Sequence, residues 1–157
     1  NEERKYLGVK LNELRNPFYL TSFFGFKEIR ETGLGVCLDL CHNRTIYNLA
    51  WKKDPEKILH EEDIDFLSRR TLFDDVKALD EKDTCHVNDG AGIYSKKGRT
   101  KHIEGMALGQ GDIKDMPKII HYLNKNKIAF VVEVNETDFK ERLNTKESIS
   151  YLLRLTD

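Results

Sequence analysis

Three short apolar segments of the chain each contain, or end in, a side chain that can bind a metal ion. Asp39 closes "GVCLDL", His86 lies in "DTCHVND" and Glu133 lies in "IAFVVEV". Burying a carboxylate or an imidazole is unfavourable unless the group is paired, hydrogen-bonded or bound to a metal. Two carboxylates and one imidazole are ligands that suit Mn²⁺, Mg²⁺, Zn²⁺ or Fe²⁺. We therefore expect these three residues to bind a divalent metal or to serve in acid–base chemistry.

Each of the three residues also has a structural interpretation. Asp39 can cap a helix or form half of a buried ion pair. A lone His86 can be a core histidine with its hydrogen bonds satisfied. Glu133 is harder to explain in this way, because a carboxylate inside "FVVEV" has few structural roles. The recurrence of such a residue at corresponding positions of three segments favours the functional interpretation.

The three cysteines, Cys37, Cys41 and Cys85, offer a competing site, a structural zinc site built with thiolates. Alternation along a strand places Cys85 on the face opposite His86, and Cys41 lies beyond its strand end. We therefore expect the thiols not to converge. The odd number of cysteines also argues against a disulfide scaffold and indicates a reducing cytosol.

The metal-binding residues need a scaffold that brings their strands together. Strands are expected over residues 5–12, 34–40, 83–89 and 128–134, and a brief one near "IEGMAL" in the polar loop from Gly90 to Gly111. Helices are expected over 22–31 (closed by Gly33), in two pieces between 52 and 80, after a cap at Asp112, and from Asn144 or Thr145. Strands that are apolar on both faces and alternate with helices indicate a parallel sheet covered by helices. The carboxyl ends of parallel strands lie on one side, so the predicted ligands can meet there.

Bulk properties narrow the classes of function. At 157 residues the chain has the length of one domain, and its formal net charge of −1 gives no overall attraction to nucleic acid. No apolar run approaches the roughly 18 residues of a membrane span, and no signal peptide opens the sequence. We expect a cytoplasmic protein with no membrane contact. The first residue is Asn1 rather than Met, and we expect an upstream part to be missing.

The segments "GVCLDLCH", "HVNDG", "GQGDI" and "VVEV", in this order, resemble the xylose isomerase-like TIM barrels. That superfamily includes sugar isomerases, ketose 3-epimerases and endonuclease IV, and the likeness runs from "VKLNELRNPFYLTS" to "TKESISYLL". The resemblance implies an α/β fold of TIM-barrel type: one domain over residues 1–157, a partial barrel of about five parallel strands with outer helices, matching strands four to eight. Such an arc leaves open edges, which implies a homo-oligomer or association with a missing N-terminal half-barrel.

The resemblance also assigns roles to individual residues. Asp39, His86 and Glu133 match the metal ligands on the fifth, sixth and last strands, and the last-strand glutamate also moves protons. His42 matches a histidine that contacts substrate in the epimerases and binds zinc in endonuclease IV. Glu13 is the candidate for the fourth-strand ligand and a second catalytic carboxylate, although "KLNEL" inverts the family's order of Glu and Asn.

The implied function is that of a metal-dependent sugar or sugar-phosphate isomerase or epimerase acting through an enediolate. A divalent ion (Mn, Zn or Mg) stabilises the enediolate oxygens, while a carboxylate moves a proton on the neighbouring carbon. In the loop "YSKKGRTKH", Arg99, Lys101 and His102 are candidate substrate-binding residues, with Arg99 or Lys101 clamping a phosphate. A solvated charged loop is the alternative interpretation of this segment.

Two other functions stay open. An endonuclease IV-like metal-dependent AP endonuclease would take DNA as its partner. It requires histidines from a first half-barrel and an aspartate two positions before His102, where Thr100 stands. The second alternative is a non-catalytic barrel fragment that acts as a binding or assembly module.

Overall fold

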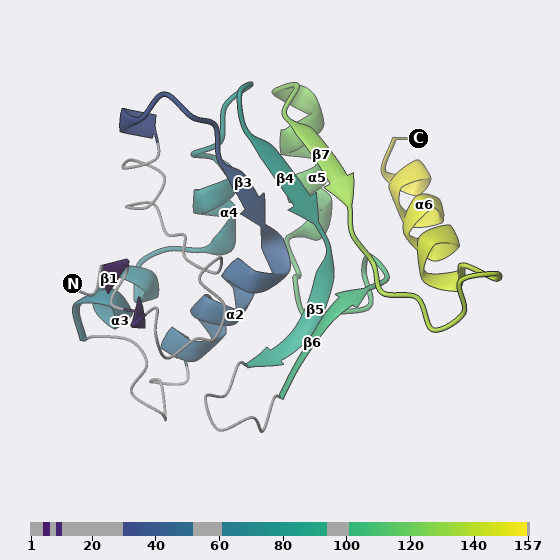
Figure 1. Ribbon diagram of the computed structural model, residues 1–157, viewed down its shortest axis with the longest axis horizontal. Coiled ribbons are helices and arrows are strands. Elements are labelled where there is room, and N and C mark those ends of the chain that lie inside the picture. The colour runs from purple at the N-terminus through teal and green to yellow at the C-terminus, as the bar shows by residue number, and fades with distance from the viewer. Residues whose placement is uncertain (1–4, 7–8, 11–29, 52–60, 94–100, 157) are drawn as a thin grey trace.

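A computed structural model describes residues 5–6, 9–10, 30–51, 61–93 and 101–156, and it shows a mixed α/β architecture (Figure 1). The elements are β1 (Lys5–Tyr6), β2 (Val9–Lys10), β3 (Cys37–Asp39), α2 (Leu40–Trp51), α3 (Glu61–Ser68), α4 (Leu72–Val76), β4 (Thr84–Val87), β5 (Asp89–Ile93), β6 (Lys101–Met106), α5 (Met116–Lys125), β7 (Ala129–Val132) and α6 (Leu143–Thr156). Among the described helices, none has both the length and the apolar character needed to cross a bilayer.

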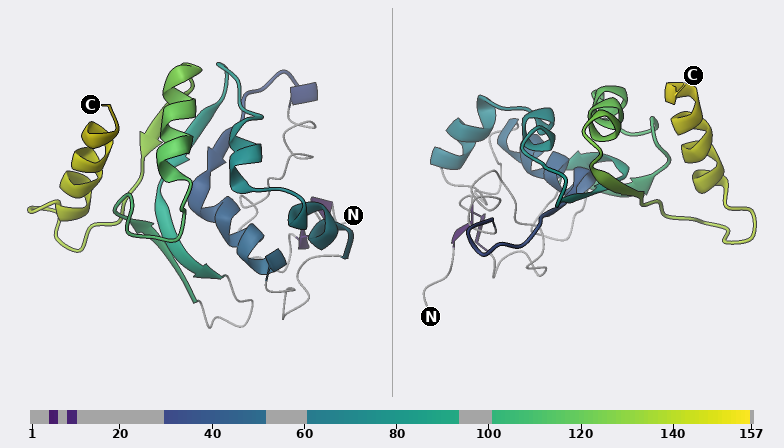
Figure 2. Two further views of the ribbon diagram at one scale, coloured as in Figure 1. Left: turned by 180° about the vertical axis from the view of Figure 1, so that it is seen from behind. Right: turned by 90° about the horizontal axis from the view of Figure 1, so that it is seen from above.

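A parallel sheet of three strands, in the order β3-β4-β7, forms the centre of the fold. Helices α4 and α5 cover one of its faces (Figure 2). Leu38, Cys85 and Val87 point into the core on that side and are fully buried. Because side chains alternate along a strand, the residues between them face the other way. The predicted α/β class, with a parallel sheet and covering helices, is confirmed.

The number and pairing of the strands differ from the expected five parallel ones. The strand near "IEGMAL" exists as β6, but it pairs antiparallel with β5, and all of β5 after Asp89 lies in the segment expected to be a loop. The described residues therefore hold three parallel strands, the antiparallel pair β5–β6 and the short antiparallel pair β1–β2. The glycines of β5 hide it in the sequence, since glycine is depleted in strands. Gly90 is required there because a Cβ atom would lie 2.3 Å from the Cys41 sulfur.

The first predicted strand, over residues 5–12, is wrong. Its described parts are the two-residue strands β1 and β2, which pair antiparallel with each other, Lys5 opposite Lys10. Most of the helix expected over 22–31 lies outside the described residues. Its closure at Gly33 is confirmed: this residue adopts a φ of 81°, and its N–H donates to the carbonyl of Arg30 at 3.0 Å.

Helix α2 was not predicted, because much of its buried surface is polar. Asn43, Thr45 and Asn48 are all buried, which removes the apolar stripe that identifies a helix in sequence. The Asn43 amide and the Tyr47 hydroxyl each donate to Asp75 of α4 at 2.7 Å. Hydrogen bonding of these groups makes their burial favourable and fixes α2 against α4.

The predicted two helices between residues 52 and 80 are confirmed as α3 and α4, separated at residues 69–71. The expected cap at Asp112 is wrong, because α5 starts later. Its N-cap is Asp115, followed by Pro117 in the first turn, where proline is well tolerated. The Asp112 carboxylate instead accepts hydrogen bonds from Arg44 at 3.3 Å and Asn48 at 3.2 Å, and so holds the preceding loop on α2.

The start of α6 depends on the carboxylate of Glu136, which lies in the loop between β7 and α6. Glu136 accepts hydrogen bonds from the backbone N–H groups of Asn144 and Thr145, at 3.2 and 2.7 Å, and from the Thr145 hydroxyl at 2.7 Å. The hydrogen bond from the Thr145 hydroxyl is the main cause of the lowered pKa of Glu136. Since the folded pKa is lowered, this stabilisation is present above the ordinary glutamate pKa and is lost as the pH falls through the lowered value.

We expect the amide protection factors of Asn144 and Thr145 to fall between pH 6 and pH 3, and to be low at both values in Glu136→Gln. Hydrogen exchange followed by NMR measures this, with Ile119 of α5 as an internal reference. Equal wild-type protection at both pH values would contradict the capping role of Glu136.

Candidate functional site

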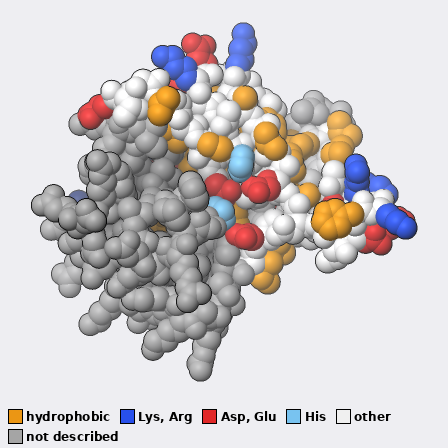
Figure 3. Space-filling view, viewed as in Figure 1, with side chains coloured by type: hydrophobic (Ala, Val, Ile, Leu, Met, Phe, Trp, Pro, Cys, Tyr) orange, Lys and Arg blue, Asp and Glu red, His pale blue; other side chains and the backbone are white. Residues whose placement is uncertain are grey.

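Asp39, His86 and Glu133 lie together on the face of the sheet opposite the buried core. Each offers one ligand atom, and these atoms all lie within 4.8 Å of one another. The register explains the convergence, since Asp39 pairs with His86 and His86 with Val131. Glu133 is two residues beyond Val131 and so points to the same face. Acidic and histidine side chains accordingly gather near the centre of the face in Figure 3.

The imidazole of His86 stands between the two carboxylates. Its Nδ1 atom is 3.0 Å from Glu133 and 3.7 Å from Asp39. The side chain of Asp39 is 17% exposed, that of His86 40% and that of Glu133 55%. An ion from solvent can therefore reach this cluster. Oxygen and nitrogen donors of this kind fit Mn²⁺, Zn²⁺ or Mg²⁺.

Asn88 connects the two carboxylates and was not predicted. Its amide nitrogen donates to the oxygens of Asp39 at 3.1 and 3.2 Å and lies 3.5 Å from Glu133. Its amide oxygen accepts the N–H of Cys41 at 2.9 Å, which fixes the orientation of the amide. Asn88 is buried. The period of two along a strand places Asn88 on the face of His86, a signal that the sequence does contain.

Asp39 has a structural role beside its place in the cluster. It precedes α2 directly, and its Oδ1 atom accepts the N–H of His42 at 2.9 Å, as an N-cap does. The capping interpretation is thus correct. It does not exclude a metal, because the other oxygen, Oδ2, is the atom nearest His86.

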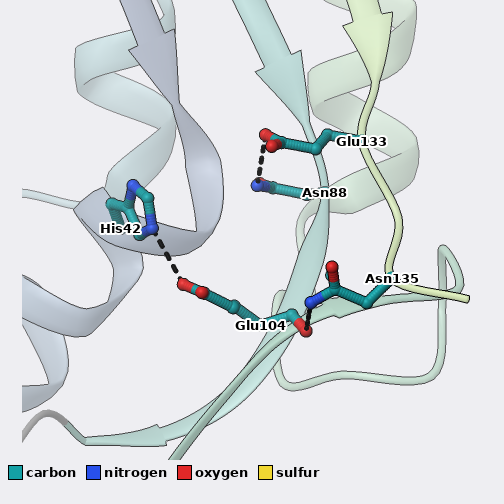
Figure 4. Close-up of a pocket in the computed structure, with 6 residues that line it drawn as sticks. His42, Asn88, Glu104, Glu133 and Asn135 are labelled. Carbon is teal, nitrogen blue, oxygen red and sulfur yellow. Dashed lines mark hydrogen bonds and ion pairs between the residues drawn. The ribbon is translucent and has the colours of Figure 1, made fainter.

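His42 links the cluster to β6. Its Nδ1 atom is 3.5 Å from Asp39, and its Nε2 atom is 2.9 Å from Glu104 (Figure 4). Glu104 was not predicted, because its position depends on the β5–β6 hairpin. Asn135, which follows β7, was also missed. Its side chain donates to the Glu104 carbonyl at 3.0 Å, and its backbone N–H donates to the Gly105 carbonyl at 2.7 Å.

These residues line a small open pocket of about 60 Å³: His42, Asn88, Glu104, Gly105, Glu133 and Asn135 (Figure 4). The pocket adjoins the cluster because Glu133 belongs to both. Its lining consists of carboxylates, amides, an imidazole and a glycine, all of which can hydrogen-bond to a polar ligand. The site therefore combines a possible metal position with a small polar pocket.

The "GQGDI" loop has the structural role of a tight turn, and Asp89 organises it. The Asp89 carboxylate is completely buried and accepts four backbone N–H groups. The donors are Gly90 at 2.9 Å, Gly109 and Gly111 at 3.0 Å, and Ile113 at 3.4 Å. Gly109 has a φ of 86°, which glycine adopts without strain.

The cysteines do not take part in the cluster. Cys37 is exposed, Cys41 and Cys85 are buried, and all three are free thiols. Burial, helped by the charges of Asp39 and Glu104, raises the pKa of Cys41 to about 12. Burial also raises the pKa of Cys85, whose side chain lies in the core on the face away from His86. Both buried thiols stay protonated at neutral pH, and a protonated thiol is a poor metal ligand.

Four of the predicted site residues cannot be placed. Glu13 and Arg99 lie outside the described residues. Lys101 and His102 belong to β6 by their backbone, but their side chains are not among the described ones. No family model, curated protein or solved structure matches this chain. The resemblance to the xylose isomerase-like barrels therefore stays a prediction.

Proposed function

We propose that this protein is a divalent-metal-dependent isomerase or epimerase of a sugar or sugar phosphate, acting through an enediolate. The observation that supports it is the convergence of Asp39, His86 and Glu133 beside a polar pocket. The proposed ion is Mn²⁺, Zn²⁺ or Mg²⁺. Bound to this cluster, it would polarise a substrate carbonyl and stabilise the negative oxygen of the enediolate.

Three side chains of the pocket have roles in the proposed reaction besides that of the metal. In an isomerisation Glu133, half-exposed at the pocket wall, accepts the proton from the carbon next to the carbonyl and returns it to the former carbonyl carbon, while the hydroxyl proton passes from one oxygen to the other. Asn88 keeps the Glu133 and Asp39 carboxylates in place through its amide nitrogen. His42 lines the same pocket, and its Nε2 atom, 2.9 Å from Glu104, orients that carboxylate beside the substrate.

Metal binding by matched histidine variants tests the proposal. We expect the wild type to bind one Mn²⁺ or Zn²⁺ per chain in isothermal titration calorimetry. His86→Ala removes a direct ligand, so its affinity should fall by at least about 100-fold, more than is usual for a neighbour of a ligand. His121→Ala, an exposed histidine on α5, is the control and should bind like the wild type. Equal affinities in the two variants would contradict the assignment.

The reaction is tested on the metal-loaded protein in D₂O. An enediolate mechanism exchanges the proton on the carbon next to the carbonyl for deuterium, which NMR detects across a panel of ketoses and aldoses. Glu133→Gln should abolish this exchange. Nicking of abasic DNA without sugar exchange would favour the endonuclease alternative. A metal-free protein that is indifferent to EDTA would favour the binding module.

A further inference from the structure

The pocket beside the cluster has a second wall, formed by Glu104 on β6 and Asn135 after β7 (Figure 4). Glu133 and Asn88 stand on the other side. Neither Glu104 nor Asn135 belongs to the three candidate metal ligands. The wall is built from two segments far apart in sequence, which only the fold brings together.

Hydrogen bonds fix the second wall in place. The Glu104 carboxylate is 2.9 Å from His42 Nε2, and the Asn135 amide nitrogen donates to the Glu104 carbonyl at 3.0 Å. Gly105, with a φ of 68°, allows this contact, since a Cβ atom there would lie 2.8 Å from the Asn135 backbone nitrogen. The amide oxygen of Asn135 is turned toward Asn88 and Glu133 (Figure 4). The wall is thus arranged before a ligand enters.

The chemistry of this pocket selects hydrogen-bond donors. The carboxylates of Glu104 and Glu133 only accept hydrogen bonds when ionised, as does the amide oxygen of Asn135. A hydroxyl group can donate to them. A phosphate or carboxylate group offers acceptors and negative charge, and none of the described lining residues is a lysine or arginine. An ammonium group can also donate, but a divalent ion on the neighbouring cluster would repel it.

We propose that Glu104 and Asn135 form a hydroxyl-binding subsite that selects an uncharged polyhydroxylated ligand over its phosphorylated form. The proposal rests on the proposed function, since it decides between the two substrate classes named there. In the complex, one ligand hydroxyl donates to Glu104 and a neighbouring hydroxyl donates to Asn135. The ligand carbonyl then faces the metal cluster on the other side of the pocket.

Sorbitol and sorbitol 6-phosphate are suitable probes, because neither has a carbonyl group that could react. Each is titrated into Zn²⁺-loaded and metal-free protein while the NMR shifts of the Glu104, Gly105 and Asn135 amides are followed. We expect sorbitol to shift these amides and sorbitol 6-phosphate to bind at least about 10-fold more weakly. Glu104→Gln should weaken sorbitol binding about 10-fold, since a hydrogen bond to a charged acceptor is lost. The same variant should reduce the difference in affinity between sorbitol and sorbitol 6-phosphate.

Glu81→Gln changes an exposed carboxylate that belongs neither to the pocket lining nor to the cluster, and as the control it should leave both affinities unchanged. Tighter binding of sorbitol 6-phosphate than of sorbitol would overturn the subsite, as would sorbitol binding that is unaffected by Glu104→Gln. The two proposals fail differently. If Zn²⁺ does not bind but sorbitol shifts these amides, the metal-dependent function fails; if Zn²⁺ binds without any sorbitol shift, only the subsite fails.

Discussion

Asp89→Asn is expected to lower the free energy of unfolding by about 4 kcal/mol, because it removes charged acceptors from buried N–H groups. The Asp89 carboxylate is completely buried and accepts four of them. Its Oδ1 atom accepts the N–H groups of Gly90 and Ile113, and its Oδ2 atom accepts those of Gly109 and Gly111.

Rotating the new amide does not rescue the variant. Each carboxylate oxygen serves two donors, so an NH₂ group in either position faces two N–H groups. Two donors then lose their acceptor, and like partial charges oppose each other. Buried donors without a partner are among the few causes of large mutational effects. The loss of order in this loop should also disturb the pocket, since the loop follows directly after the segment that carries Glu104 and Gly105.

Urea unfolding of the variant and of a matched control measures the effect. Asp65→Asn changes an exposed aspartate of α3 in an ion pair with Arg69, and it should alter stability by less than about 0.5 kcal/mol. A value for Asp89→Asn within about 1 kcal/mol of the wild type would show that the four hydrogen bonds do not determine the loop.

The sequence allows the central part of the candidate site to be predicted, because that part depends on a simple rule. Asp39, His86 and Glu133 end or interrupt apolar strands, and parallel strands bring such positions to one edge. The pairing of β3, β4 and β7 follows this rule, and the register then places the three side chains on one face. Only alternation and strand direction are needed for this result.

The second wall of the pocket depends on features that the sequence hides. Glu104 reaches His42 only because β5 and β6 form an antiparallel hairpin, and the glycines of β5 conceal that strand. Helix α2, which carries His42, was missed because its buried Asn43 and Asn48 are satisfied by Asp75 and Asp112 from other elements. Hydrogen-bond partners from distant segments make such burial possible, and local patterns do not reveal them.

Asn88→Asp is expected to have the second large effect, a loss of stability whose size depends on whether a metal is present. The new carboxylate keeps an acceptor for the Cys41 N–H but places an oxygen 3.1 to 3.5 Å from the carboxylates of Asp39 and Glu133. Three like charges then share one site. In EDTA at pH 8 we expect a loss of about 3 kcal/mol, which lowers the Tm by about 10 °C.

A divalent ion should reverse much of this loss, because it neutralises the added charge and gains a fourth ligand. The rise in Tm on adding Mn²⁺ is therefore expected to be larger in Asn88→Asp than in the wild type. Asn124→Asp, an exposed substitution in the last turn of α5, controls for the charge alone: through the helix dipole it should lower the Tm by no more than about 4 °C, and it should leave the rise on adding Mn²⁺ unchanged. The response of the Tm to Mn²⁺ distinguishes a metal site from a purely structural network. If Asp39, His86 and Glu133 only stabilised the sheet edge, Mn²⁺ would leave the Tm of the variant as low as EDTA does, because no ion would offset the crowded carboxylates.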